Sequence, residues 1–168
     1  IKNNFIKVMS LGTIGIGLYF IFYILAFANA PAAQVNVLNY MWPVFMLVFS
    51  SIFLKTKFSL KILLAFFLGI LGTYIVITKG TFFNLQSEFL MGYMFAIGAA
   101  ISWAIFSILN SKYKFDPFAS LFVYNLLGFL TLTIALIITN SSFFVERNVL
   151  LGTAYIGLFP TAIGYGLW

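Results

Sequence analysis

Three polar residues and one proline stand at helical spacing within a strongly apolar stretch. They stand at positions i, i+3, i+4 and i+7, so one continuous helix places them on one face: Asn36, Asn39, Tyr40 and Pro43. The amides and the phenol exchange hydrogen bonds, and the proline removes one backbone donor and can bend the helix. Polar side chains are costly in hydrocarbon and usually face protein or a water-filled cavity. The pattern therefore indicates either a cavity that binds a polar ligand or hydrogen bonds that join two helices.

Aromatic residues deep within apolar stretches are the second set of candidates. Trp42 adjoins the polar positions, Trp103 lies inside another apolar stretch, and Tyr19 and Tyr23 lie inside a third. Tryptophans that only anchor a protein at the membrane surface gather near the ends of spans, so these interior positions indicate ligand contact or core packing. The residues that we predict to bind a substrate are Tyr19, Asn36, Asn39, Tyr40, Trp42, Pro43 and Trp103.

The residue types needed for metal and acid–base chemistry are scarce. The chain has no cysteine and no histidine, and its three acidic residues, Glu88, Asp116 and Glu146, stand at the edges of apolar stretches. Thiolate or imidazole metal sites and disulfides are therefore excluded within this segment. Few candidates remain for general acid–base catalysis or for a carboxylate proton relay. We expect no cofactor and no enzyme activity.

The composition is that of a membrane protein. Of the 168 residues, 63% are hydrophobic and 7% are charged, and the mean hydropathy is +1.10; soluble domains carry about 25% charged residues. Residues 8–54 contain no charge, which is room for two crossings of about 20 residues each. Only helices and closed barrels satisfy their backbone in hydrocarbon, and runs such as 62–68 (ILLAFFL) show no strand-like alternation. We predict an all-α membrane protein, a polytopic helix bundle.

Proline, asparagine and lysine-containing breaks divide the chain into six expected spans. These are residues 8–28, 32–54, 60–78, 89–109, 117–138 and 149–168. The glycines of the first span, Gly12 and Gly15, indicate close helix packing. Because the chain starts at Ile1 and stops at Trp168 inside an apolar run, we expect a fragment of a longer protein.

The basic residues predict how the spans are oriented. One side of the membrane receives most of them: Lys2, Lys7, Lys55, Lys57, Lys61, Lys112 and Lys114. The other side receives Lys79 and Arg147. Basic loops face the cytoplasm, so we expect a multi-pass inner-membrane protein with residue 1 in the cytoplasm. Topology accounts for the net charge of +6, and the expected partners are the lipid bilayer and a small molecule, with no nucleic acid.

A weak internal repeat appears at an offset of 140 residues. Segments 11–13 (LGT) and 16–19 (IGLY) recur as 151–153 (LGT) and 156–159 (IGLF). The two copies begin on opposite sides of the membrane, because an odd number of spans separates them. An inverted repeat is typical of secondary transporters, whose substrate sites lie near the midplane.

Several segments carry a family resemblance: 32–45 (AAQVNVLNYMWPVF), 54–55 (LK), 68–72 (LGILG), 92–93 (GY), 99–104 (AAISWA) and 157–162 (GLFPTA). Through them the chain resembles the drug/metabolite transporter superfamily, in its EamA-type branch. The resemblance implies a ten-helix fold of two inverted five-helix repeats, with the six spans as helices three to eight. Residues 1–80 are then the end of the first repeat, with three spans, and residues 81–168 the start of the second, with three spans, the last one truncated.

The resemblance also implies a function. Members export small metabolites, such as amino acids or drugs, by alternating access around a mid-membrane cavity. The block 39–43 (NYMWP) is similar to that of bacterial exporters of aromatic amino acids. The alternatives are a channel, which needs a continuous polar pore, and a membrane protein without a transport role.

Overall fold

The computed structural model describes residues 5–54, 60–78, 80, 87–113, 115–139 and 146–159. All regular secondary structure within these ranges is helical. Residues 1–4, which precede the expected first span, and residues 140–145, which precede the expected last span, lie outside the described residues. So do residues 160–168, the end of that last span. The predicted all-α membrane fold is confirmed for the part of the chain that is described.

The first span is one long helix with an irregular middle. It consists of α1 (Phe5–Leu11), the π-helical segment η2 (Gly12–Leu18) and α2 (Tyr19–Asn29). It ends where Ala30 takes an extended conformation immediately before Pro31, because a proline disfavours helix at the residue that precedes it.

The second span is broken, which corrects the expectation of a single continuous helix over 32–54. It consists of α3 (Ala32–Asn39) and α4 (Trp42–Phe53), separated at Tyr40 and Met41. Pro43 explains the break: it has no N–H to donate to the carbonyl of Asn39, and its ring crowds that carbonyl. The sequence indicated that this proline could disturb the helix, and the interruption lies just before it, at Tyr40 and Met41.

The remaining elements are α5 (Leu60–Ile77), η3 (Ser87–Phe89), α6 (Leu90–Tyr113), α7 (Pro117–Ile138) and α8 (Arg147–Ile156). The bounds of α5, α6 and α7 are close to those expected, whereas the expected last span, 149–168, is described only as far as residue 159. The bounds of α7 are those expected, and its N-terminus is capped by Asp116, whose carboxylate accepts from the backbone N–H of Ala119 at 2.8 Å. Helix α6 is longer than expected and reaches Tyr113.

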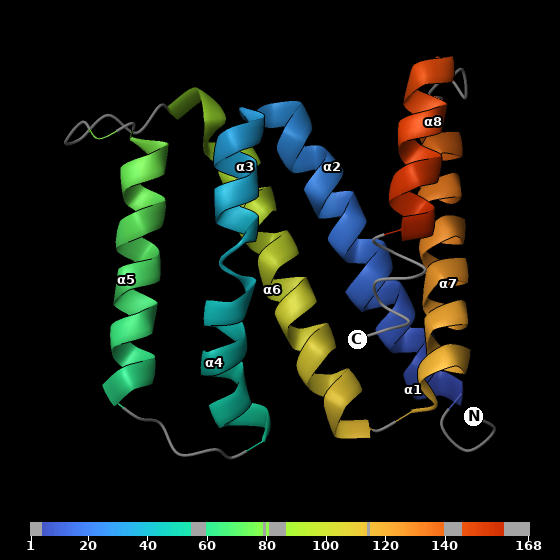
Figure 1. Cartoon of the computed structure of the whole chain (residues 1–168), viewed down its shortest axis with the longest axis horizontal. Coiled ribbons are helices and arrows are strands. Elements are labelled where there is room, and N and C mark those ends of the chain that lie inside the picture. The colour runs from blue at the N-terminus through green and yellow to red at the C-terminus, as the bar shows by residue number, and fades with distance from the viewer. Residues whose placement is uncertain are drawn as a thin grey trace.

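Helix α6 occupies the centre of the bundle. Figure 1 shows it running between the α3–α4 pair and the α1–η2–α2 helix, and its most extensive packing is against α2 and α4. Four alanines of α6 are fully buried: Ala96, Ala99, Ala100 and Ala104. Small side chains allow helix axes to approach closely in membranes, so this face of α6 is the surface on which the other helices pack.

Two apolar cores form at opposite ends of α6. One contains Ala26, Val35, Leu38, Tyr93 and Ala96, and the other contains Val8, Leu11, Phe106 and Tyr124. Between them lies the middle of the bundle, which is where the polar and aromatic candidates of the sequence meet.

The helix ends alternate between the two ends of the bundle, as a multi-pass membrane protein requires (Figure 1). Among the described residues, four helices are long and apolar enough to cross a bilayer: 5–29, 32–53, 87–113 and 118–138. Two shorter apolar helices, α5 and the described part of the last span, accompany them. The 18 residues of α5, at about 1.5 Å each, measure roughly 27 Å, close to the thickness of the hydrocarbon core.

Candidate functional site

Three aromatic rings meet where α2 faces α6. Tyr19, the first residue of α2, lies 5.1 Å from Trp103 of α6, measured between ring centroids. Tyr23, one turn further along α2, stacks on Tyr19 at 5.5 Å with an interplanar angle of 18°. Residues four apart share a helix face, so the spacing of the two tyrosines produces this stack directly.

Two hydrogen bonds tie α3 to these tyrosines. The Tyr23 hydroxyl donates to Asn36 Oδ1 at 2.6 Å, and Asn39 Nδ2 donates to the Tyr19 hydroxyl at 3.2 Å. We call the five residues the aromatic–amide cluster: Tyr19, Tyr23, Asn36, Asn39 and Trp103. The cluster joins three helices, α2, α3 and α6, near the middle of the bundle.

One buried atom of the cluster lacks a hydrogen-bond partner among the described residues. Asn39 is buried, with 8% of its surface exposed, and its Oδ1 atom accepts from no donor among the described residues. A buried acceptor without a donor costs about 1–3 kcal/mol. Such groups are rare in folded proteins, and each one calls for a physical reason.

The π-helical segment positions Tyr19. Its i→i+5 hydrogen bonds widen the helix and shift the register of the residues that follow, a local feature frequent at functional sites. Gly15 in this segment packs so closely on Phe106 that an added Cβ would come within 2.3 Å of that ring. Phe106 in turn lies 5.4 Å from Trp103. The close packing predicted for Gly12 and Gly15 is confirmed, since both are buried against α6 or α7.

The structure brings together four of the predicted substrate-binding residues, which are Tyr19, Asn36, Asn39 and Trp103. Of the other three, the side chain of Tyr40 is 72% exposed, Pro43 is exposed, and Trp42 is half-buried at the start of α4. The continuous helix that was expected to place these positions on one face is interrupted at Tyr40–Met41. Substrate binding by these residues stays a prediction.

Tyr23 was absent from the predicted set, although it makes the shortest hydrogen bond of the cluster. Its position four residues after Tyr19 was the available signal. The described part of the chain contains no group of three or more acidic, histidine or cysteine side chains that lie together to hold a metal ion.

Comparison with known proteins gives two matches. The family model of the EamA-like transporter family matches residues 1–78 and 90–168. The chain is also similar to the aromatic amino acid exporter YddG of Ancylobacter novellus, with 24% identity over 156 residues, covering 89% of this chain and 53% of the relative. The chain thus spans about half the length of this curated relative. No solved structure gives a significant match.

Proposed function

Because the chain belongs to the EamA-like transporter family, we propose that the full protein exports amino acids with apolar or aromatic side chains by alternating access. Family membership and the similarity to an exporter support a multi-pass inner-membrane transporter of a small molecule rather than an enzyme. The similarity to an aromatic amino acid exporter supports the choice of substrate. The residues that we propose to hold the substrate are those of the aromatic–amide cluster, together with Tyr40, Trp42 and Pro43.

The observation that carries the proposal is the unpartnered Oδ1 of Asn39 beside the rings of Tyr19 and Trp103. An α-ammonium group has three donors, and one of them would satisfy this acceptor. The faces of tyrosine and tryptophan rings attract a cation, by about 0.5–2 kcal/mol when water is excluded. An aromatic substrate side chain would also stack favourably on these rings. Amino acids with apolar side chains carry both of these groups, an ammonium and an apolar body.

The burial of this acceptor supports alternating access as the mechanism. The Oδ1 atom of Asn39 is sealed from solvent here, so a substrate reaches it only after the surrounding helices have moved apart. Two irregular segments flank the cluster: η2 immediately before Tyr19, and the break at Tyr40–Met41 immediately after Asn39. Helix bends concentrate at π-helical turns and prolines, so these two segments are the proposed hinges of the motion.

Counterflow in proteoliposomes tests the proposal. The full-length protein is reconstituted, and exchange of labelled phenylalanine is measured for wild type, Asn39→Ala and Trp103→Ala. We expect saturable exchange in wild type and a loss of about tenfold or more in either variant, since each removes a contact worth more than about 1.4 kcal/mol. Asn125→Ala is the matched control, because Asn125 is exposed on α7 and its Nδ2 donates to the Leu121 carbonyl of its own helix.

The outcomes separate the parts of the proposal. Exchange of leucine and phenylalanine but not of glutamate supports an apolar amino-acid site. Exchange that is equal in all four proteins removes the cluster from the substrate pathway. A conductance without saturation or counterflow would indicate that the protein is a channel and not an exporter.

A further inference from the structure

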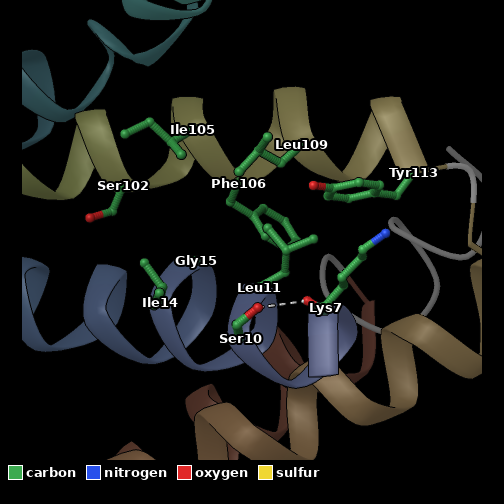
Figure 2. A pocket seen from close by; sticks show the side chains of 10 residues that line it. All are labelled: Lys7, Ser10, Leu11, Ile14, Gly15, Ser102, Ile105, Phe106, Leu109 and Tyr113. Carbon is green, nitrogen blue, oxygen red and sulfur yellow. Dashed lines mark hydrogen bonds between the residues drawn. The ribbon is translucent and has the colours of Figure 1, made fainter. Parts of the chain in front are cut away.

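A cavity of about 180 Å³ lies between α1–η2 and α6 and shares no residue with the aromatic–amide cluster. Figure 2 shows its lining, contributed by α1 and η2 on one side and by α6 on the other. The lining residues are Lys7, Ser10, Leu11, Ile14, Gly15, Ser102, Ile105, Phe106, Leu109 and Tyr113. One water molecule occupies about 30 Å³ in the liquid, so the cavity has room for a small organic group.

One end of this cavity is positively charged. The Nζ atom of Lys7 lies 4.8 Å from the centroid of the Tyr113 ring (Figure 2). Ser10 is close to Lys7, and its hydroxyl donates to the Lys7 backbone carbonyl at 3.0 Å, whereas Ser102 lines the opposite end (Figure 2). None of the lining residues is acidic. An ammonium group binds a carboxylate or a phosphate through charge-assisted hydrogen bonds.

The rest of the cavity is apolar. Phe106 and Leu109 of α6 face Leu11 and Ile14 across it. Small-molecule sites typically combine an apolar lining with a few polar groups that fix the ligand's orientation. The cavity also lies at the end of the bundle that carries Lys61 and Lys112, which is the predicted cytoplasmic end.

We propose that this cavity is a second binding site, which takes an organic anion whose carboxylate or phosphate pairs with Lys7 and whose apolar body lies on Phe106 and Leu109. The site does not depend on what the full protein transports. Two sources supply this chemistry at a cytoplasmic membrane surface: a soluble aromatic or aliphatic carboxylate, and the headgroup region of an anionic lipid. Basic pockets between membrane helices on this side of a bilayer are known to suit lipid headgroups.

Protection of a cysteine in the cavity from alkylation tests the proposal without any transport assay. The chain contains no cysteine, so Ser10→Cys introduces a unique reactive group in a full-length protein whose other cysteines have been removed. The probes are 3-phenylpropionate, phenethylamine as the cationic counterpart, and vesicles of phosphatidylcholine with or without phosphatidylglycerol. Leu109→Cys, on the facing helix, repeats the measurement should Ser10→Cys disturb the site.

We expect 3-phenylpropionate or phosphatidylglycerol to slow the alkylation, and phenethylamine to leave it unchanged. Adding Lys7→Met should raise the half-protecting concentration about tenfold or more, and Lys7→Arg should restore it, since one charge-assisted hydrogen bond is lost and regained. Lys61→Met is the matched control, because it removes the same charge from the exposed start of α5, outside the cavity. Protection by the soluble acid identifies a solute site, and protection by phosphatidylglycerol alone identifies a lipid site.

Two results would overturn the site. One is the absence of protection by either anion at both cysteine positions. The other is equal protection by phenethylamine and by 3-phenylpropionate, because a site that ignores charge does not use Lys7. A protein that shows the protection but transports no amino acid would reject the proposed function and leave this site in place.

Discussion

At the scale of single residues, the two asparagines of α3 differ in how completely their hydrogen bonds are satisfied. Asn36 Oδ1 accepts a short hydrogen bond from Tyr23, whereas Asn39 Oδ1 accepts none from the residues that the structure describes. Functional sites commonly retain groups that reduce stability, because a ligand satisfies them only part of the time. The pair therefore allows a comparison between an amide whose oxygen is hydrogen-bonded and one whose oxygen is proposed to await a substrate.

Leucine substitutions of the two asparagines should have different effects on stability. Asn39→Leu removes a buried acceptor without a donor, but it also removes the Nδ2 group that donates to the Tyr19 hydroxyl. The two effects offset each other, so the free energy of unfolding should change by less than about 1 kcal/mol, while phenylalanine exchange is lost. Asn36→Leu leaves the Tyr23 hydroxyl without its acceptor and should lower that free energy by about 1 kcal/mol. Thermal unfolding in detergent measures both. A larger destabilisation by Asn39→Leu than by Asn36→Leu would show that Asn39 is a structural residue.

The sequence identified individual residues of the site better than their grouping. Tyr19 and Trp103 could be chosen as candidates from the sequence because they lie away from the span ends, where anchoring at the membrane surface does not explain them. Their contact was not predictable, since it depends on how α2 crosses α6. The Lys7 cavity was not predicted for the same reason. In the sequence Lys7 indicates only the orientation of the first span, and its contact with Tyr113 is visible only in the fold.

At the scale of elements, η2 is the segment whose conformation differs most from what composition suggests. The helix bounds were predictable from hydrophobic length and from prolines, and the bend near Pro43 from the missing N–H. The π-helical turns were not predictable, because no residue type specifies them. Gly12 and Gly15 indicated only that other helices approach closely, and both are buried, as is Gly17.

Gly15→Ala should disrupt the contact between η2 and α6. The new methyl group would lie 2.3–2.6 Å from atoms of Phe106, and overpacking of this kind costs about 1–3 kcal/mol. Gly72→Ala on α5 is the control, since nothing lies within 4 Å of its Cβ position and alanine favours helix by about 1 kcal/mol.

Thermal unfolding of the two variants provides the measurement, and Gly15→Ala combined with Phe106→Ala should recover part of the loss. Equal melting temperatures for Gly15→Ala and Gly72→Ala would argue against a tight contact between η2 and α6 in the full protein.

At the scale of the whole molecule, α6 is a central helix with one core at each end and the aromatic–amide cluster between them. Large apolar side chains such as Phe118, Phe122 and Phe129 of α7 remain exposed, as expected for surfaces that meet lipid or further helices. The division into repeats at residues 80 and 81 stays a prediction, as does the cytoplasmic location of residue 1.

Labelling with a membrane-impermeant maleimide tests the orientation of the bundle. Ser111→Cys lies at the predicted cytoplasmic end of α6, and Ser87→Cys lies at the opposite end, at the start of η3. In intact cells we expect labelling at position 87 and none at position 111 until the cells are permeabilised. The reverse pattern would invert the topology and place the Lys7 cavity on the outer side.

The contact at the predicted outer end of α6 has a consequence for how the protein divides its time between conformations. There the buried hydroxyl of Tyr93 donates to Oε1 of Gln34 on α3 at 2.8 Å. A conformer that separates α3 from α6 must break this bond, at about 0.6–1.7 kcal/mol in a membrane protein. That difference changes the ratio of the two populations by roughly 3- to 20-fold. One hydrogen bond at the predicted outer end of α6 can thus act as a latch that favours the conformer in which α3 and α6 are in contact.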